Sequence, residues 1–413
     1  MRLNGGVSSD TPSLESIVAD AVALRRELHR HPELGTELPR TQAAVLDALS
    51  GTPGLELSTG KGLDSVTAVL RGAAPLPAGR VRPVVLLRGD MDALPVQEAT
   101  GVAYASEEDG RMHACGHDLH TSGLVGALRY LAARRDELVA DVVGMFQPAE
   151  ESDGGARPMI EEGLLTAAGR RVDAAYALHV QSSQLPHGVF ASRPGTHSAS
   201  CDDLIVTVIG SGGHGSAPHR AQDPVPVAAE MVLALQTLVT RRFDALREPV
   251  VATVGSITAG TAANIIPDTA RVAITLRSFS AEARSRLLPA VREMVTHVAA
   301  AHDMQVRLEV DCDYPVTVND PEHVDAVRSV VTELFGPDAY QESPEPGAGS
   351  EDFSFVLQEV PGAYVDLGAA PPDVDPATAP SGHSPLAVFD DAVLARSIRV
   401  LAELALRAEA VAE

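Results

Sequence analysis

The 413-residue sequence predicts an α/β domain that is interrupted by a smaller α+β domain. Its length exceeds the usual ceiling for a single hydrophobic core, which makes two domains the default expectation. Several short apolar runs end in groups of polar residues, a pattern typical of buried strands whose carboxyl ends carry a site. Between about residues 198 and 310 the predicted elements follow the order β-α-β-β-α-β of the ferredoxin-like arrangement.

The charge and the cysteine content exclude several classes of function. A net charge of -24 and an isoelectric point near 4.9 argue against a surface that binds nucleic acid or an anionic membrane. Cys115, Cys201 and Cys312 are odd in number and far apart, so a disulfide framework is not expected. No signal peptide is visible, and no stretch approaches the roughly 20 apolar residues that span a bilayer. We therefore expect a cytoplasmic protein.

The first predicted element is an amphipathic helix. Thr11-Pro12 is typical of a helix start, with Pro12 near the first helical position. Apolar residues from Leu14 to Leu28 follow helical spacing, and the helix is expected to end near His31-Pro32. His29 and His31 are interpreted as a solvated helix end.

A buried parallel strand is predicted next. Four consecutive apolar residues, Val84 to Leu87, precede Gly89. Asp90 and Asp92 then lie at the carboxyl end of this strand, on the same face of extended chain. Aspartate in a loop commonly forms a turn. Alternatively, a carboxylate at this place orients a metal-bound histidine or bridges ions.

The segment 112–121 concentrates chemistry, because it holds one thiol, three imidazoles and one carboxylate. In extended backbone, Cys115 and His117 point to the same side and can reach one metal ion. Thiolate and imidazole suit zinc and its first-row neighbours. The alternative is a buried cysteine beside surface histidines. An apolar, helix-like segment, 122–133, follows.

Two further strands end in polar residues. The strand 140–146 leads into Glu150-Glu151. In extended backbone these two side chains cannot both point at one spot. One is therefore expected to bind metal while the other lies next to the metal-bound water. A solvated surface pair is the alternative. The strand 174–180 places His179 at the mouth of the sheet.

The inserted region contains four strands and two helices. The expected elements are the strand 204–208, the helix 224–239, the strands 249–257 and 270–276, the helix 281–301 and the strand 305–310. The Gly-rich loop 212–219 lacks the Gly-Lys-Ser/Thr ending of a P-loop. Because α/β signals resume after Asn319, residues 1–197 and 311–413 are assigned to one domain and 198–310 to the insertion.

Eight ordered motifs carry a family resemblance. They are the segments 88–95, 112–121, 147–151, 213–219 and 349–353, the residues His179 and Asn264, and the triplet His383-Ser384-Pro385. The chain resembles the metal-dependent aminoacylase/amidohydrolases, which include hippurate hydrolases and hydrolases of auxin–amino acid conjugates. These belong with the co-catalytic metallopeptidases of the carboxypeptidase G and aminoacylase type. The resemblance implies a mixed-sheet metallopeptidase-like catalytic domain, with an inserted ferredoxin-like lid and dimerisation domain that forms a homodimer.

The resemblance also implies a site for two divalent metal ions, with zinc, manganese, cobalt or nickel as candidates. The implied ligands are Cys115, His117, Glu151, His179 and His383. Glu150 is implied as the general base and Asp92 as the residue that orients its half of the site.

Residues of the inserted domain are implied to bind substrate. His214 and Asn264 would polarise the scissile carbonyl, and Arg277 would bind a substrate carboxylate. In relatives the lid histidine can come from the partner subunit. Leu119 departs from the family pattern, since relatives often carry Gly there, and it either narrows or only repacks the region beside His117.

The expected reaction is hydrolysis of the amide bond of N-acyl amino acids by metal-activated water, which releases a carboxylic acid and an amino acid. The alternative on the same scaffold is a dipeptidase or an N-carbamoyl-amino-acid hydrolase. A remote alternative is a non-catalytic small-molecule-binding or redox-sensing protein, with Cys115 as the sensor. The joint presence of all five implied ligands and Glu150 disfavours it.

Overall fold

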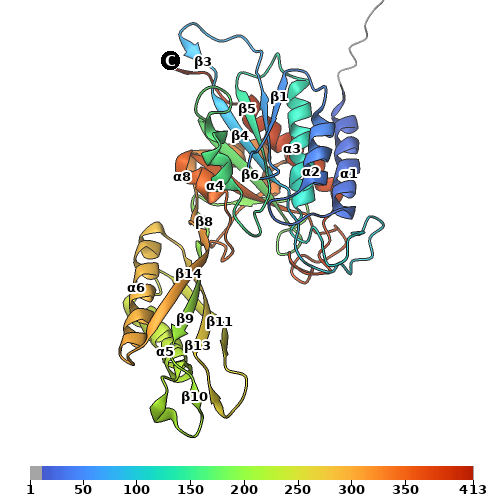
Figure 1. Cartoon of the computed structure of the whole chain (residues 1–413). Coiled ribbons are helices and arrows are strands. Elements are labelled where there is room, and N and C mark those ends of the chain that lie inside the picture. The colour runs from blue at the N-terminus through green and yellow to red at the C-terminus, as the bar shows by residue number, and fades with distance from the viewer. Residues whose placement is uncertain (1–11, 413) are drawn as a thin grey trace, which may run out of the picture. The chain divides into compact units, whose positions relative to one another are not determined.

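The computed structural model describes residues 12–412, which divide into two compact units, each with its own hydrophobic core (Figure 1). The larger unit comprises the described residues up to Pro194, Asn319–Ser343 and the residues from Val356 onward. The smaller unit comprises Gly195–Val318 and Pro344–Phe355. The chain thus leaves the larger unit twice, first for the segment that builds most of the smaller unit and again for the short segment Pro344–Phe355.

The larger unit is built on an eight-stranded mixed sheet. In spatial order its strands are β1 Leu55–Thr59, β2 Val66–Leu70, β5 Asp141–Gln147, β4 Val84–Asp90, β6 Ala174–Gln181, β17 Gly362–Gly368, β7 Phe190–Ser192 and β16 Tyr340–Glu342. The central strands β5, β4, β6 and β17 run parallel. Every residue of β4 is buried, so the predicted buried parallel strand is confirmed.

Helices accompany this sheet, some in contact with its strands and others in an outer layer. They are α1 Leu14–Arg30, α2 Pro39–Leu49, α3 His117–Ala132, α4 Ala156–Glu161, α7 Pro321–Phe335, α8 Ser354–Glu359 and α9 Leu394–Leu406. Helix α3 contacts β4 and β6 as well as α1 and α9, so it lies between the sheet and an outer helical layer (Figure 1). A short strand pair, β3 Arg80–Val81 with β18 Val411–Ala412, joins distant parts of the chain.

Helix α1 ends at Arg30, next to the expected position, but its start and the environment of its last turn differ from the expectation. Ser13 caps its N-terminus by accepting a hydrogen bond from the Ser16 N–H, so Pro12 precedes the cap; Thr11 lies outside the described residues. At the other end, His29 is buried and its Nδ1 lies 2.7 Å from Asp118 Oδ2. The interpretation of His29 as a solvated residue is wrong, because the last turn of α1 packs against the start of α3 and buries that ring.

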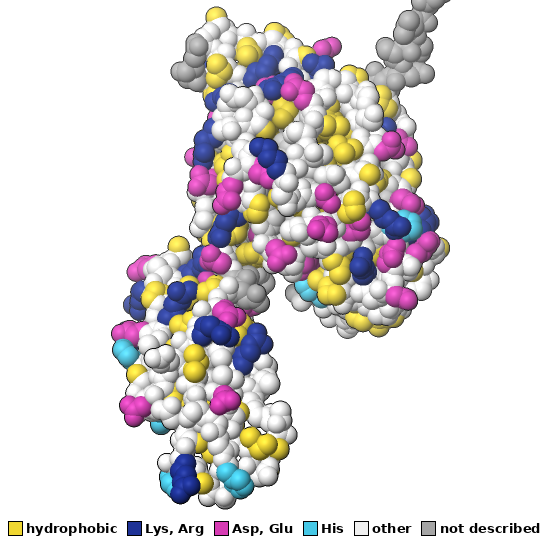
Figure 2. Space-filling model, viewed as in Figure 1, with side chains coloured by type: hydrophobic (Ala, Val, Ile, Leu, Met, Phe, Trp, Pro, Cys, Tyr) yellow, Lys and Arg dark blue, Asp and Glu magenta, His cyan; other side chains and the backbone are white. Residues whose placement is uncertain are grey.

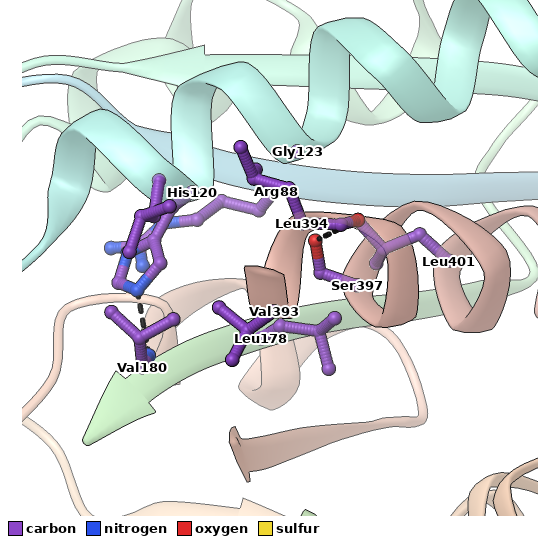
Figure 3. A pocket seen from close by; sticks show the side chains of 10 residues that line it. Arg88, His120, Gly123, Leu178, Val180, Val393, Leu394, Ser397 and Leu401 are labelled. Carbon is purple, nitrogen blue, oxygen red and sulfur yellow. Dashed lines mark hydrogen bonds between the residues drawn. The ribbon is translucent and has the colours of Figure 1, made fainter. Parts of the chain in front are cut away.

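Helix α3 begins at His117, five residues before the predicted apolar segment. Gly116, at the N-cap position, has a left-handed backbone with φ 82°. The segment that carries Cys115 and His117 is therefore a turn into a helix, and the assumption of extended backbone was wrong. Leu119 is buried and lines a cavity of about 10 Å³. Figure 3 shows this cavity with two of its other lining residues, His120 and Leu178. Leu119 therefore packs the interior of the larger unit.

The smaller unit has the ferredoxin-like topology that the sequence predicts. Its elements are β9 Cys201–Ile209, α5 Pro224–Arg242, β11 Val250–Ala259, β13 Thr269–Ser278, α6 Ala281–Ala300 and β14 Gln305–Tyr314. The four strands form an antiparallel sheet in the order β11-β13-β9-β14. Shorter strand pairs are β10 Gly213–His214 with β12 Ile265–Ile266, and β8 Gly195–Ser198 with β15 Thr317–Asn319.

The surface carries side chains of every kind. Acidic, basic and hydrophobic groups are interspersed over the face that Figure 2 shows. Within residues 12–412, no helix combines the length and the apolar composition needed to cross a lipid bilayer.

Candidate metal centre

Candidate site residues gather at the carboxyl ends of three adjacent parallel strands. Asp90 is the last residue of β4, and Asp92 follows it closely. Glu150 and Glu151 follow β5, and His179 lies near the end of β6. In open α/β sheets this edge is where sites form, because the loops after neighbouring strands converge there.

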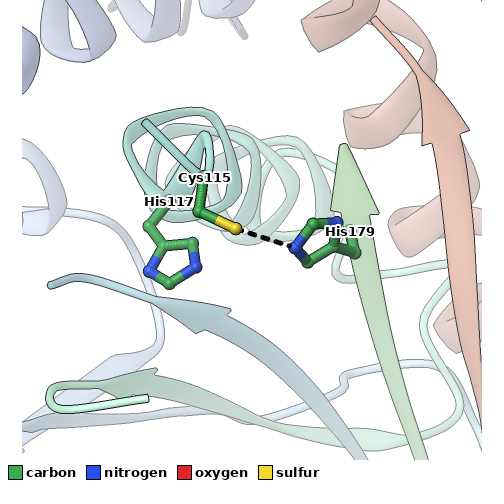
Figure 4. A group of neighbouring side chains, drawn as sticks. All are labelled: Cys115, His117 and His179. Atoms are coloured by element: carbon green, nitrogen blue, oxygen red, sulfur yellow. Dashed lines mark hydrogen bonds between the residues drawn. The ribbon is translucent and has the colours of Figure 1, made fainter. Parts of the chain in front are cut away.

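Three groups of side chains, which share members, offer possible metal ligands. Within each group the ligand atoms lie within 4.8 Å of one another. The groups are Cys115 with His117 and His179, Cys115 with Glu151 and His383, and His117 with Glu150 and Glu151. In the first group the Cys115 Sγ lies 3.3 Å from His179 Nε2, and His117 enters from the start of α3 (Figure 4). Because the groups share members, the structure brings all five expected ligands around one centre.

The donor set and its environment fit divalent cations. Thiolate, imidazole and carboxylate together suit zinc and its first-row neighbours. His117 is only 1% exposed, yet neither ring nitrogen makes a well-aligned hydrogen bond within residues 12–412. Its Nε2 lies 3.6 Å from Asp90 Oδ2 and 3.8 Å from Glu151 Oε1. These distances are too long for hydrogen bonds, so a cation beside Nε2 would satisfy a buried atom that otherwise lacks a partner.

Asp92 organises the backbone that carries the two glutamates. Its Oδ1 accepts a hydrogen bond from the Glu150 N–H and its Oδ2 accepts one from the Glu151 N–H, both at 3.0 Å. Asp92 Oδ1 also lies 3.4 Å from His117 Nδ1. One buried carboxylate therefore holds the glutamate turn and lies beside the ring of a candidate ligand.

The glutamate turn has an unusual backbone conformation. Ala149, immediately before Glu150, has φ 59°. Non-glycine residues in this left-handed region are uncommon and cost roughly 1–3 kcal/mol, so surrounding contacts must hold them. The turn lets Glu150 and Glu151 both approach His117. The expectation that adjacent glutamates cannot reach one spot was wrong, because it assumed extended backbone.

The carboxylates raise the proton affinity of two candidate ligands in the metal-free chain. Burial alone would lower the pKa of His117, but Asp90, Asp92 and Glu151 outweigh it and raise that pKa to about 10. Burial, reinforced by the charge of Glu151, raises the pKa of the Cys115 thiol well above its ordinary value. Metal binding would therefore displace protons from both groups.

His179 has the opposite electrostatic environment. Burial, and secondarily the neighbouring His120, lower the pKa of His179 to about 3, so its imidazole is neutral at physiological pH. Its Nδ1 lies 3.4 Å from the Gln181 side-chain nitrogen, and that nitrogen donates to Asp366 Oδ1 at 2.8 Å. A neutral imidazole is the form that binds metals.

Sequence reasoning gave Asp90 a candidate role but assigned none to Arg88 and His120, the two residues that contact its carboxylate. Arg88 pairs with Asp90 while its Nε donates to Gln147 Oε1 at 3.0 Å. His120 Nδ1 lies 2.6 Å from Asp90 Oδ1. Arg88 and His120 both lie in segments that carry the family resemblance. Arg88 directly follows an apolar run in a buried strand, and a charged residue at such a place indicates a buried partner of opposite charge.

A second unassigned network lies beneath the start of α3. Asp118 contacts Arg25 Nε at 2.8 Å and His29 Nδ1 at 2.7 Å. Burial opposes ionisation of Asp118, but the charge of Arg25 and the contact with His29 hold its pKa well below the usual range. The sequence signals were the histidine pair at the end of the first helix and the carboxylate of the segment 112–121.

The expected substrate-binding residues all lie in the smaller unit. His214 lies in β10, and Asn264 directly precedes β12, its pairing partner. The Gly215 N–H donates to the Asn264 carbonyl at 2.8 Å, so these two residues lie close together. Arg277 lies near the far end of β13 and donates from Nη1 to Ser350 Oγ at 2.9 Å. Within the smaller unit, Arg277 is therefore separated from the other two.

Curated relatives cover most of the chain. It is 37% identical to "Thermostable carboxypeptidase 2" of Saccharolobus solfataricus, over 89% of this chain and 90% of that protein. It is 35% identical to "Hippurate hydrolase" of Campylobacter jejuni, over 96% of this chain and 98% of that protein.

Solved structures share the fold. The crystal structure of Bacillus subtilis YXEP protein, described as "a Dinuclear Metal Binding Peptidase from M20 Family", superposes with a TM-score of 0.77. That protein is 29% identical, and the match covers 95% of this chain and 98% of the other. Residues 86–407 match the sequence profile of peptidase family M20/M25/M40. The resemblance inferred from the motifs is thus confirmed, and the chain is an amide-bond hydrolase that belongs to peptidase family M20/M25/M40.

Proposed function

We propose that this protein hydrolyses the amide bond of N-acyl amino acids and releases a carboxylic acid and a free amino acid. The observation that supports the proposal most strongly is the convergence of five candidate ligands with Glu150 beside them at one edge of the sheet. The similarity to a hippurate hydrolase over almost the whole chain supports the same substrate class.

Two divalent cations would be held by Cys115, His117, Glu151, His179 and His383, whose possible ligand atoms fall into overlapping groups. When bound, such ions lower the pKa of a water molecule and polarise the scissile carbonyl. The thiolate favours zinc, with manganese, cobalt or nickel as alternatives.

Glu150 would act as the general base. Glu150 is 8% exposed and its backbone N–H is bonded to Asp92, so its side chain extends from a fixed and buried position. It would take a proton from the attacking water and deliver it to the leaving nitrogen, a contribution of roughly 10²–10⁴-fold in rate. Asp92 would maintain the positions of Glu150, Glu151 and His117 relative to one another.

The smaller unit would supply the remaining substrate contacts. Positions 269 and 277 lie eight residues apart in β13, which is about 26 Å of extended chain. His214 and Asn264 lie beyond the first of these ends, because the Gly212 N–H is bonded to Asp268. A small N-acyl amino acid cannot span that distance. We therefore propose a homodimer in which Arg277 of one subunit and His214 and Asn264 of the other contact the same substrate.

Dipeptide hydrolysis is the second candidate, and the similarity to a thermostable carboxypeptidase favours it. An N-carbamoyl amino acid would use the same groups. All three substrates present an amide carbonyl next to an amino-acid carboxylate, so the same centre would serve each. Specificity then depends on the walls of the acyl pocket.

The experiment is a substrate panel on protein loaded with zinc or manganese. Release of free amino acid is measured from N-acetyl, N-benzoyl and N-carbamoyl amino acids and from dipeptides. The Glu150→Gln variant is expected to bind metal normally and to lose at least about 100-fold in kcat. Glu161→Gln, an exposed glutamate in α4, is the matched control and should keep full activity. Near-normal turnover by Glu150→Gln would remove Glu150 from the mechanism.

A further inference from the structure

We propose that His120 is a positioning residue for the metal centre, because it replaces backbone pairing between the two strands that carry Asp90 and His179. The inference depends on the proposed function, since it concerns the same centre. It rests on the end of the β4–β6 ladder, on the two hydrogen bonds of one imidazole, and on the cavity beside it.

The ladder between β4 and β6 ends before the site. Its register runs from Val85–Ala174 to Arg88–Ala177. Beyond that point β4 remains paired with β5 as far as Asp90, and β6 remains paired with β17 as far as Gln181. The two strands therefore separate where they present their site residues, and some other contact must set their spacing.

The imidazole of His120 occupies that gap. Its Nε2 accepts a hydrogen bond from the Val180 N–H at 2.8 Å, the backbone amide next to His179 (Figure 3). Because Nε2 is an acceptor, the ring proton must be on Nδ1, which donates to Asp90 Oδ1 at 2.6 Å. One ring thus joins the end of β4 to the end of β6.

Both ends of this bridge touch candidate ligands. Asp90 Oδ2 faces His117 Nε2 at 3.6 Å, and Val180 follows His179 in the chain. The ring of His120 lies 4.9 Å from that of His179 and 5.4 Å from that of His117, measured between centroids. Although His120 shares a possible ligand group with Asp90 and His117, both of its nitrogens are engaged. It is therefore suited to hold ligands and not to bind metal itself.

Packing alone does not fix this ring. His120 borders the cavity of about 10 Å³, which is otherwise lined mainly by apolar side chains from β6 and α9 (Figure 3). The cavity on that side leaves room for the ring to tilt. The two hydrogen bonds are thus the contacts that set its orientation, and their loss should relax the spacing between the strands.

Three substitutions separate the two bonds. His120→Ala removes both. His120→Asn keeps a nitrogen near the Nδ1 position that can donate to Asp90, and His120→Gln keeps an oxygen near the Nε2 position that can accept from Val180 N–H. Ser397→Ala is the control, because Ser397 lines the same cavity while its hydroxyl donates within α9 to the Leu394 carbonyl.

The primary measurement is zinc affinity of the purified full chain by chelator competition, with the Tm of the metal-free protein as the second readout. His120→Ala is expected to weaken zinc binding by about 10–100-fold, the usual effect of removing a group that orients metal ligands. The Asn and Gln variants are each expected to recover part of that loss. Ser397→Ala should bind zinc as the wild type does. At saturating zinc, kcat should fall in His120→Ala while KM changes little.

Two results would overturn the inference. One is zinc affinity in His120→Ala equal to that of Ser397→Ala. The other is a zinc affinity that is reduced in His120→Ala and equally reduced in His120→Asn and His120→Gln. The loss would then come from the enlarged cavity and not from the missing hydrogen bonds. Wild-type protein that binds zinc but hydrolyses no N-acyl amino acid would refute the proposed function and leave this comparison valid. Wild-type protein that binds no metal would refute both.

Discussion

Replacing Asp92 by asparagine changes one oxygen of a carboxylate that accepts two backbone hydrogen bonds. Both bonds, to the N–H groups of Glu150 and Glu151, are 3.0 Å long, and Asp92 is 1% exposed. An asparagine can accept only one of them, because its NH₂ group would face the second N–H. Donor would then oppose donor at a site from which water is largely excluded.

The size of the effect follows from these contacts. A buried donor left without a partner costs about 1–3 kcal/mol, so Asp92→Asn should lose about that much free energy of unfolding. Asp92→Ala, which leaves both N–H groups unpaired, should lose about 2–6 kcal/mol. Domains are stable by only about 5–15 kcal/mol, so either loss is measurable. Zinc affinity should also fall by about 10–100-fold, because Asp92 Oδ1 lies 3.4 Å from His117 Nδ1.

Urea denaturation of the metal-free protein measures the first effect, and chelator competition measures the second. Asp64→Asn is the matched control, because Asp64 Oδ2 accepts a single backbone N–H, that of Leu38, at 2.8 Å and the amide oxygen can replace it. The reasoning is refuted if Asp92→Asn unfolds within about 0.5 kcal/mol of the control and binds zinc as tightly as the wild type.

Two further predictions follow from the same region. Zinc affinity should rise with pH by about tenfold per unit for each proton displaced, because the metal-free chain holds protons on Cys115, whose pKa is raised, and on His117, whose pKa is about 10. Calorimetry in buffers of different ionisation enthalpy counts these protons, and a pH-independent affinity would contradict the assignment of both residues as ligands. Gly89→Ala should destabilise the fold by about 1–3 kcal/mol, because a Cβ there would lie 2.7 Å from the His120 carbonyl oxygen. Gly255→Ala, where a Cβ meets nothing within 4 Å, is the control in the same denaturation assay.

The strands and the inserted domain were predictable because they depend on local pattern. The apolar run Val84 to Leu87 became a fully buried strand, and the order β-α-β-β-α-β became the four-stranded antiparallel sheet of the smaller unit. Apolar periodicity reports which face of an element is buried, and a short window of sequence contains that information.

The local geometry of the candidate site was not predictable in the same way. Cys115 and His117 are not in extended chain, since Gly116 turns left-handed and starts α3. The glutamates after β5 follow Ala149 at φ 59°, and Asp92, in the segment after β4, holds this turn. A contact from a distant segment holds the second turn, and Ala149 gives no local signal of it; Gly116 permits the left-handed backbone of the first turn but does not require it.

The sequence by itself determined the family, the order of elements and the residue types suited to the centre, because motifs and periodicity are properties of neighbouring positions. The tertiary structure alone decided that His29 is buried against Asp118 and that His120 bridges Asp90 and Val180. It also decided that Arg277 lies far along β13 from His214 and Asn264. These relations join residues that are distant in the chain, and only the packing of helices on the sheet and the pairing of strands sets such distances.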